Sequence, residues 1–374
     1  MQKQTIIKII TCLFGILLFI VAVIYANTDV PAANFNSEMS FETARVIEIL
    51  EDDTEINPDF PDTRVGQRLI LIEILTGVHA GATGEVRNHF SPSFQVDVSE
   101  GNRLSVMVGQ VDDERFDVLL HNQERTGILI GAIVFFLLAL GIVGGKKGIM
   151  SILGLVFTLA NIVFLLIPLL VKGYHAVLVT LVILIVTTVV SLVLLSGWSK
   201  KTAVAIVGCV SGVGFAAFLA FAVGQLARVN GFNMEEVNQL ITVGFSTELR
   251  ISGLFISGVL IASLGAVMDI AMTIASSADE LVINNQQISR KQLFKSAMNI
   301  GKDAMGTMSN TLILAFVGTG LNMMIVIFSF GISFAQLINM DFIAVEIIRS
   351  LAGSLGLVVT VPVVAYFASR LMVK

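Results

Sequence analysis

The chain has 374 residues, of which 55% are hydrophobic and 14% are charged, with a net charge of −5. This composition excludes an ordinary soluble globular protein, because the excess of apolar side chains has to face lipid. The charge is unevenly distributed: residues 27–125 hold 19 acidic and 7 basic side chains, whereas the remainder is net positive. Such a split is typical of an acidic soluble domain joined to a membrane domain with cationic loops.

Several classes of chemistry have no sequence support. Cys12 and Cys209 both lie in apolar runs, so the sequence predicts neither a disulfide framework nor a thiolate metal cluster. The four histidines are scattered without the spacing of a metal site, and there is no nucleotide loop, zinc-protease motif or nucleophile elbow in a usable context. We therefore expect no catalytic residues, no metal, no cofactor and no nucleic-acid partner.

The N-terminal third is predicted to contain a membrane anchor followed by a β-rich domain. A first apolar run at about residues 9–25 follows Lys3 and Lys8 and lacks a clear cleavage site, so residues 1–26 are interpreted as a retained transmembrane helix. Residues 27–125 show four alternating stretches, at 45–50, 69–75, 94–98 and 104–108, with a turn predicted at 99–102. We expect a small β-barrel or sandwich of five or six strands.

The remaining residues, 126–374, are predicted to form a membrane domain of seven helices. A helix needs about 20 apolar residues to cross a hydrocarbon core of about 30 Å. Seven runs meet this requirement, at about 127–143, 151–171, 176–195, 203–226, 251–276, 310–330 and 350–371. With the first span the total is about eight, and the excess of Lys and Arg in alternate short loops predicts that both termini are cytoplasmic and that the β domain is extracytoplasmic.

A basic amphipathic helix is predicted near 289–305, between the runs at 251–276 and 310–330. Ser289 and Gln292 form a capping box, and apolar residues then recur at helical spacing opposite four cationic side chains. The pattern favours two structures equally: a helix lying on the inner membrane surface, or a helix packed over the bundle.

Polar residues within the last three apolar runs indicate a polar path, because such residues in lipid normally face a cavity or a partner helix. Asp269 is the central candidate, as a proton or cation site, although its distance from the predicted end of its span also allows an interfacial position. Small residues on the same faces are equally expected from close helix packing. The candidate path residues are Asp269, Thr273, Asn310, Thr311, Asn322, Glu346, Arg349 and Thr360.

Three stretches resemble a known family. Residues 265–272, 293–312 and 346–356 resemble the YibE/F-like family of bacterial multi-pass membrane proteins, and the resemblance extends from about residue 127 to the C-terminus. It implies a protein of the bacterial plasma membrane, described at most as a transporter. Asn299 and Asp303 also fall in the matching motifs, with no role implied.

Two functions remain open at this stage. The first is a permease for a small solute or ion, and the alternative is a non-transporting scaffold or sensor whose outer β domain binds a partner or an envelope component. An intramembrane enzyme is disfavoured, because the sequence predicts no acidic partner for Asp269 at the same depth. The expected partners are the lipid bilayer and either another membrane subunit or a second copy of the chain.

Overall fold

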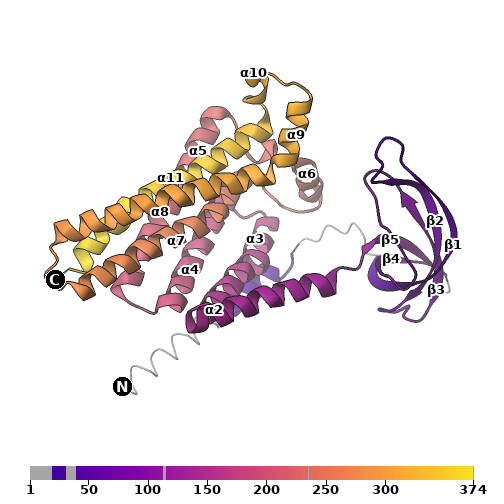
Figure 1. The fold of residues 1–374 in the computed structure, drawn as a ribbon, viewed down its shortest axis with the longest axis horizontal. Coiled ribbons are helices and arrows are strands. Elements are labelled where there is room, and N and C mark those ends of the chain that lie inside the picture. Colours follow the sequence, from indigo (N-terminus) through magenta and orange to yellow (C-terminus); the bar gives the residue numbers. More distant parts are fainter. Residues whose placement is uncertain (1–18, 31–38, 113–114, 235, 374) are drawn as a thin grey trace, which may run out of the picture. The chain divides into compact units, whose positions relative to one another are not determined.

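The computed structural model describes residues 19–30, 39–112, 115–234 and 236–373, which form two compact units. One unit comprises residues 34–139, and the other comprises residues 1–33 with 140–374. Residues 19–27 are helical, and the earlier part of the predicted first span lies outside the described residues. Figure 1 shows the elements of both units, each of which is described by itself below.

The first unit contains a five-stranded antiparallel sheet that curves into a half-barrel. The strands are β1 (Met39–Ile56), β2 (Arg64–Ile74), β3 (Thr83–Phe90), β4 (Arg103–Asp112) and β5 (Arg115–Gln123), in the spatial order β3-β2-β1-β4-β5. Alternate residues of β1, β2 and β4 point inward and form the apolar core of the unit. Two register shifts in the β1–β2 ladder are bulges of the kind that bend a strand.

The predicted strands are confirmed in part. The alternating stretches at 45–50, 69–75 and 104–108 fall in β1, β2 and β4, but the stretch at 94–98 is not a strand. It is an extended segment whose Val96 and Val98 are nevertheless buried in the core. The predicted turn at 99–102 is present, with Gly101 at a φ of 83° and the Asn102 amide donating to Ser99 O. The sequence pattern did not predict strands β3 and β5. Their inward-facing residues alternate with charged residues over only a short stretch of chain, so the pattern is weak.

Two charged side chains, Glu42 and Arg68, are buried in this unit. The Arg68 side chain is 7% exposed and donates to Asp52 at 2.8 Å and to the carbonyl of Val98 at 2.7 Å, while its guanidinium lies over the ring of Phe90. The hydrogen bond from Arg68 lowers the pKa of Asp52 to about 2. The acidic cluster around Asp52 is therefore not simply solvated, since one member anchors a buried cation.

The second unit is helical. It contains part of α2 (Thr126–Asn161), then η1 (Ile162–Leu166), α3 (Ile167–Val171), α4 (Ala176–Ser196), α5 (Lys200–Ala227), η2 (Gly231–Asn233), α6 (Val237–Ser246), α7 (Leu254–Asn284), α8 (Arg290–Thr319), α9 (Leu321–Ser329), α10 (Phe334–Leu337) and α11 (Asp341–Leu371). Among the described residues, five helices are long and apolar enough to cross a membrane, or six if the bent pair α8–α9 counts as one span. The chain is therefore a membrane protein of helical type.

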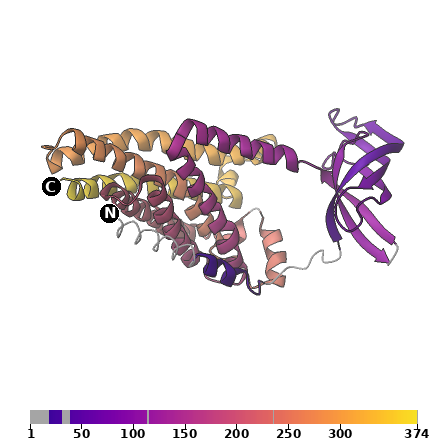
Figure 2. The same cartoon turned by 90° about the horizontal axis from the view of Figure 1, so that it is seen from below.

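One of those five segments, Thr126–Val171, is too long for a single span and is broken at Gly145. Gly145 has a φ of 54°, a conformation that favours glycine. A Cβ at Gly141 would lie 3.7 Å from Ile152 Cδ1, although 11 residues of straight helix would separate them by about 16 Å. The chain therefore reverses at Gly145 (Figure 2), which leaves room for the two spans predicted at 127–143 and 151–171.

The centre of the helical unit is the contact among α5, α7 and α11. Glycines allow it: a Cβ at Gly212 of α5 would collide with Thr360 Oγ1 and lie 2.8 Å from Gly356 O of α11. A Cβ at Gly208 would likewise collide with Val364. Gly208 and Gly212 therefore serve close packing of α5 against α11, as small residues four apart commonly do in membrane helices.

The seventh predicted span differs from the observed helix. The structure has one helix, α8, running through Gly306 into the region predicted to begin the span at 310, and a bend of 61° follows at Gly320, before α9. The capping box of Ser289 and Gln292 is present at the start of α8. Leu293, Ala297 and Gly301 are buried in the bundle, so the first half of α8 packs against other helices. No separate amphipathic helix of 289–305 exists, because the backbone hydrogen bonds continue without a break.

Candidate functional site

Helices α7, α8 and α11 lie side by side, and two sets of contacts define their relative heights (Figure 1). At the first level, a Cβ at Gly301 of α8 would lie 2.9 Å from Ile274 of α7 and would also touch Val361 of α11. At the second level, a Cβ at Gly353 of α11 would lie 2.9 Å from Leu312 of α8 and 3.6 Å from Ser263 of α7. Helix α8 is thus antiparallel to α7 and α11.

These levels place Asp269 near the middle of the apolar part of α11. Asp269 and Gly306 are each five residues from the first level, towards the second, so they share one height. On α11 the same height falls at about residue 357. Residues 350–369 of α11 carry no charge, lie between Arg349 and Arg370, and form a segment about 30 Å long. Asp269 is therefore about 4 Å in height from the middle of that segment.

The polar residues at this height lie on the exposed faces of α7 and α8. Asp269 and Thr273 are exposed on α7, and so are the polar residues of α8, namely Asn299, Lys302, Asp303, Thr307, Asn310 and Thr311. A Cβ at Gly265 of α7 or at Gly306 of α8 would meet no atom within 4 Å. These glycines therefore have no packing role within the described chain, unlike those of α5. The result is a polar face with small residues, which the bundle itself leaves uncovered.

One known family covers the part of the chain that carries this face. The model described as "YibE/F-like protein" matches residues 132–374, which include all of α7, α8 and α11. The chain belongs to the YibE/F-like family. No curated protein and no solved structure matches it.

The other predicted path residues of this YibE/F-like protein lie elsewhere. Thr360 of α11 is fully buried where this helix meets Gly212 of α5. Its hydroxyl donates to Gly356 O of the same helix. Glu346 and Arg349 form an ion pair at 2.7 Å near the start of α11, with the Arg349 guanidinium over the ring of Phe316. Asn322 is exposed on α9, beyond the bend. Asp269 and Thr273 thus lie on the exposed face of α7, and Asn310 and Thr311 lie on the exposed face of the neighbouring α8, whereas these four others lie elsewhere.

Sequence reasoning missed a second polar feature, on α4. Thr180, Thr187 and Ser191 share one face of α4, and their buried hydroxyls make no hydrogen bond among the described residues. The Oδ1 atom of Asn161 is also buried without a partner. Ser191 lies next to Gly154 of α2, as a Cβ there would be 3.6 Å from Ser191 Cβ. The spacing of 180, 187 and 191 was the available signal, but it is hidden in an otherwise apolar run.

The proline in the third predicted span has a specific partner. In an α-helix the carbonyl of Phe164 would accept from residue 168, which is Pro168 and has no N–H. The Asn27 amide donates to Phe164 O at 2.7 Å instead. Lys172 donates to Tyr25 O and the hydroxyls of Tyr25 and Tyr174 are 2.6 Å apart, so the first helix is tied to this break by polar contacts.

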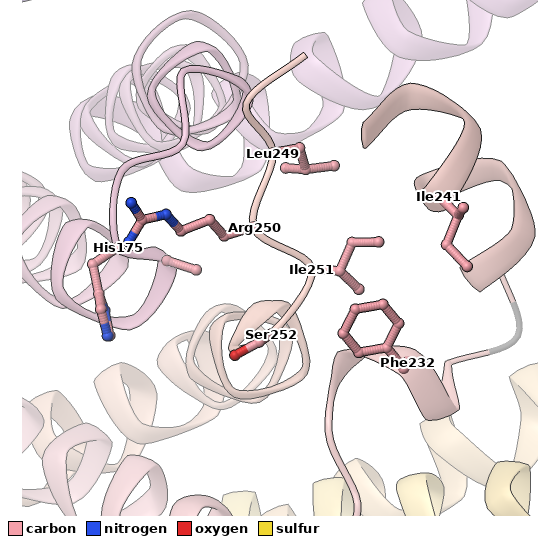
Figure 3. Close-up of a pocket in the computed structure, with 8 residues that line it drawn as sticks. His175, Phe232, Ile241, Leu249, Arg250, Ile251 and Ser252 are labelled. Carbon is pink, nitrogen blue, oxygen red and sulfur yellow. The ribbon is translucent and has the colours of Figure 1, made fainter. Parts of the chain in front are cut away.

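Two cavities lie at the end of the helical unit where α4, α7 and α11 begin. One, of about 490 Å³, is lined by Arg250, His175 and Ser252 on one side and by apolar residues such as Phe232 on the other (Figure 3). The second, of about 820 Å³, is a largely apolar groove formed by residues of α8 to α11, with Phe316 and Phe342 among them. Neither resembles a catalytic centre, and no group of three or more metal-binding side chains occurs in the described residues.

Proposed function

We propose that this protein is a permease that moves a small solute or ion across a cell membrane, with the exposed faces of α7 and α8 lining the path. The observation that carries the proposal is the position of Asp269, exposed and close to the middle height of an apolar helix. An aspartate in the hydrocarbon core costs several kcal/mol unless it faces a cavity or a partner. Such residues typically mark ion or proton pathways.

The topology that accompanies this proposal has eight spans in the plasma membrane. They are the first helix, two segments on either side of Gly145, and α4, α5, α7, α8 and α11. Helix α8 is counted together with α9, and this bent pair contains the predicted span at 310–330. Cationic residues gather at one end of the helices, with Lys200, Lys201, Arg290, Lys291 and Arg370 among them. This distribution supports cytoplasmic termini.

The side chains of the proposed path suit a small hydrophilic cargo. Asp269 supplies a carboxylate that can bind a cation or carry a coupling proton, and Thr273, Thr307 and Asn310 supply neutral oxygens and an amide within about 6 Å of its height, on either side of it. Gly265 and Gly306 leave space beside them. The arrangement lacks a nucleotide site, so transport is coupled either to an ion gradient or to an energy source on another subunit.

The test is a flux assay on the full chain in proteoliposomes with a pH-sensitive dye inside, screened with monovalent cations, divalent cations and small anions. Asp269→Asn removes the charge at almost constant volume and is expected to abolish solute-dependent flux. Glu280→Gln is the matched control, since Glu280 is exposed on the same helix close to its inner end.

Wild-type flux in the Asp269→Asn variant, at equal protein content, would remove Asp269 from the path. An absence of flux by the wild type across the whole panel would instead favour the scaffold or sensor function. In that case, deleting residues 41–120 is expected to abolish the cellular phenotype, while Asp269→Asn leaves it intact.

A further inference from the structure

The outward face of α8 has the spacing of a helix–helix contact. Six exposed residues follow each other in steps of four, three, four, three and four residues. They are Asn299, Asp303, Gly306, Asn310, Ile313 and Val317. This is the spacing of the a and d positions of a heptad, which places them in one line along the helix. We call this line the α8 seam. It lies opposite Leu293, Ala297 and Gly301, which pack inward.

The seam is too polar to face lipid at its height. Gly306 is level with Asp269, near the middle of the uncharged segment of α11, and Lys302, Asp303 and Asn310 are within about 6 Å of Gly306 along the helix. They therefore lie within the half-thickness of the hydrocarbon core, about 15 Å. Two charged and several amide side chains would be costly there without a protein or water on that side.

The charges at the seam have no counterpart in their own chain but are complementary to each other. Among the described residues, neither Lys302 nor Asp303 takes part in an ion pair. Asp303 lies on the seam line and Lys302 lies at the edge of the seam, because consecutive residues on a helix differ by about 100°. A two-fold axis along the membrane normal would bring Lys302 at the edge of one copy's seam close to Asp303 of the other copy, and the reverse.

Gly306 and Asn310 fit the same arrangement. Open space around Gly306 allows a second backbone to approach closely, and small residues at such positions promote helix association in membranes. Asn310, one turn away, is placed to exchange amide hydrogen bonds with its symmetry mate. We propose that the α8 seam is the contact surface for a second copy of this chain, which forms a parallel homodimer and closes the lipid side of the polar face of α7 and α8. This proposal does not depend on transport.

The first test is disulfide cross-linking of the full chain in native membranes, in a Cys12→Ala/Cys209→Ala background. Gly306→Cys and Ile313→Cys place a thiol in the seam, and both positions are exposed in the single chain. Val186→Cys is the control, because Val186 is exposed in the middle of α4 and outside the seam. Copper-phenanthroline is expected to give a covalent dimer with both seam variants and none with the control.

The charges provide a second, independent readout. Lys302→Asp and Asp303→Lys each create like charges across the seam and are expected to reduce the yield of cross-linked dimer by about tenfold. The double variant, Lys302→Asp/Asp303→Lys, exchanges the two charges and is expected to restore the yield. Restoration distinguishes a reciprocal pair from a general loss of folding.

Three results would overturn the proposal. The first is that neither seam variant gives a dimer although the protein is folded. The second is that the Val186→Cys control cross-links as well as the seam variants do. The third is that the seam cross-links to a different membrane protein while the purified chain gives no dimer in proteoliposomes. The last result would assign the seam to another subunit.

Discussion

The two units differ in whether their charged and amide side chains have partners within the unit. In the β unit each charged or amide side chain in the interior finds a partner within the unit: Arg68 binds Asp52 and Val98 O, Glu42 accepts from Ser40 and Thr76, and Asn88 donates to Val96 O. In the helical unit, Asp269 and Lys302 lie on an open face at the height of an apolar helix, without an ion pair among the described residues.

This difference indicates that the β unit is a self-sufficient fold, whereas the helical unit depends on what surrounds it. Charged groups in a water-soluble domain can be solvated or paired locally, but groups in a bilayer need a partner or a water-filled path. The same contrast occurs between glycines, because Gly208 and Gly212 of α5 are tightly packed, whereas Gly265 of α7 and Gly306 of α8 are open.

The largest effect is expected from Gly212→Leu. Any Cβ there would collide with Thr360 and approach Gly356 O at 2.8 Å, so α5 and α11 would separate. We expect destabilisation of about 3 kcal/mol or more, seen as a loss of monodisperse protein and a lower melting temperature in detergent. Gly265→Leu, on the open face of α7, is the control and is expected to change the melting temperature little. Equal effects at both glycines would show that the α7 face is packed.

A smaller effect is expected from Arg68→Met in the β unit, about 2 kcal/mol. The substitution leaves the carbonyl of Val98 without its donor, whereas Asp52, whose side chain is 42% exposed, can be solvated. Urea unfolding of the fragment 34–124 measures it, with exposed Arg45→Met of the same sheet as the control. A fragment that does not unfold cooperatively would refute the self-sufficiency of the unit itself.

Asn27→Ala is expected to cost about 1 kcal/mol, the usual value of one hydrogen bond. The carbonyl of Phe164 would lose the donor that replaces the missing N–H of Pro168. Pro168→Ala restores a backbone N–H, so the loss is expected to shrink in that background. A double-mutant cycle of melting temperatures in detergent measures this coupling, and strict additivity would contradict the proposed compensation.

The smallest effect concerns pH and the β unit. The pKa of Asp52 is lowered to about 2 by its hydrogen bond from Arg68, so the ionised carboxylate stabilises the folded state at pH values above its ordinary pKa near 4. That contribution is lost as the pH falls from about 4 through about 2. It is limited by solvent screening. As the pH is lowered through this window, the urea midpoint of the 34–124 fragment is expected to fall less steeply for Asp52→Asn than for the wild type. Parallel curves would show that the Arg68–Asp52 pair does not contribute to the pH dependence of stability.

Much of the architecture could be predicted from the sequence because it depends on local pattern. The apolar runs of α4, α5, α7 and α11, the strands β1, β2 and β4, and the capping box at Ser289 follow from composition and spacing. The family motifs likewise coincide with α7, α8 and α11. Asp269 was found as a candidate because a carboxylate in an apolar run is conspicuous.

The tertiary structure decided the rest, because burial and height depend on which helices meet. The run predicted as a span at 310–330 covers the second half of α8 and all of α9, and the sequence did not show that these two helices meet at a bend of 61° or that the polar first half of α8 packs along α11. Thr360 and Asp269 look alike as polar residues in spans, yet one is enclosed by Gly212 and the other is open. A one-dimensional pattern specifies the face of a helix, and only packing specifies what that face touches.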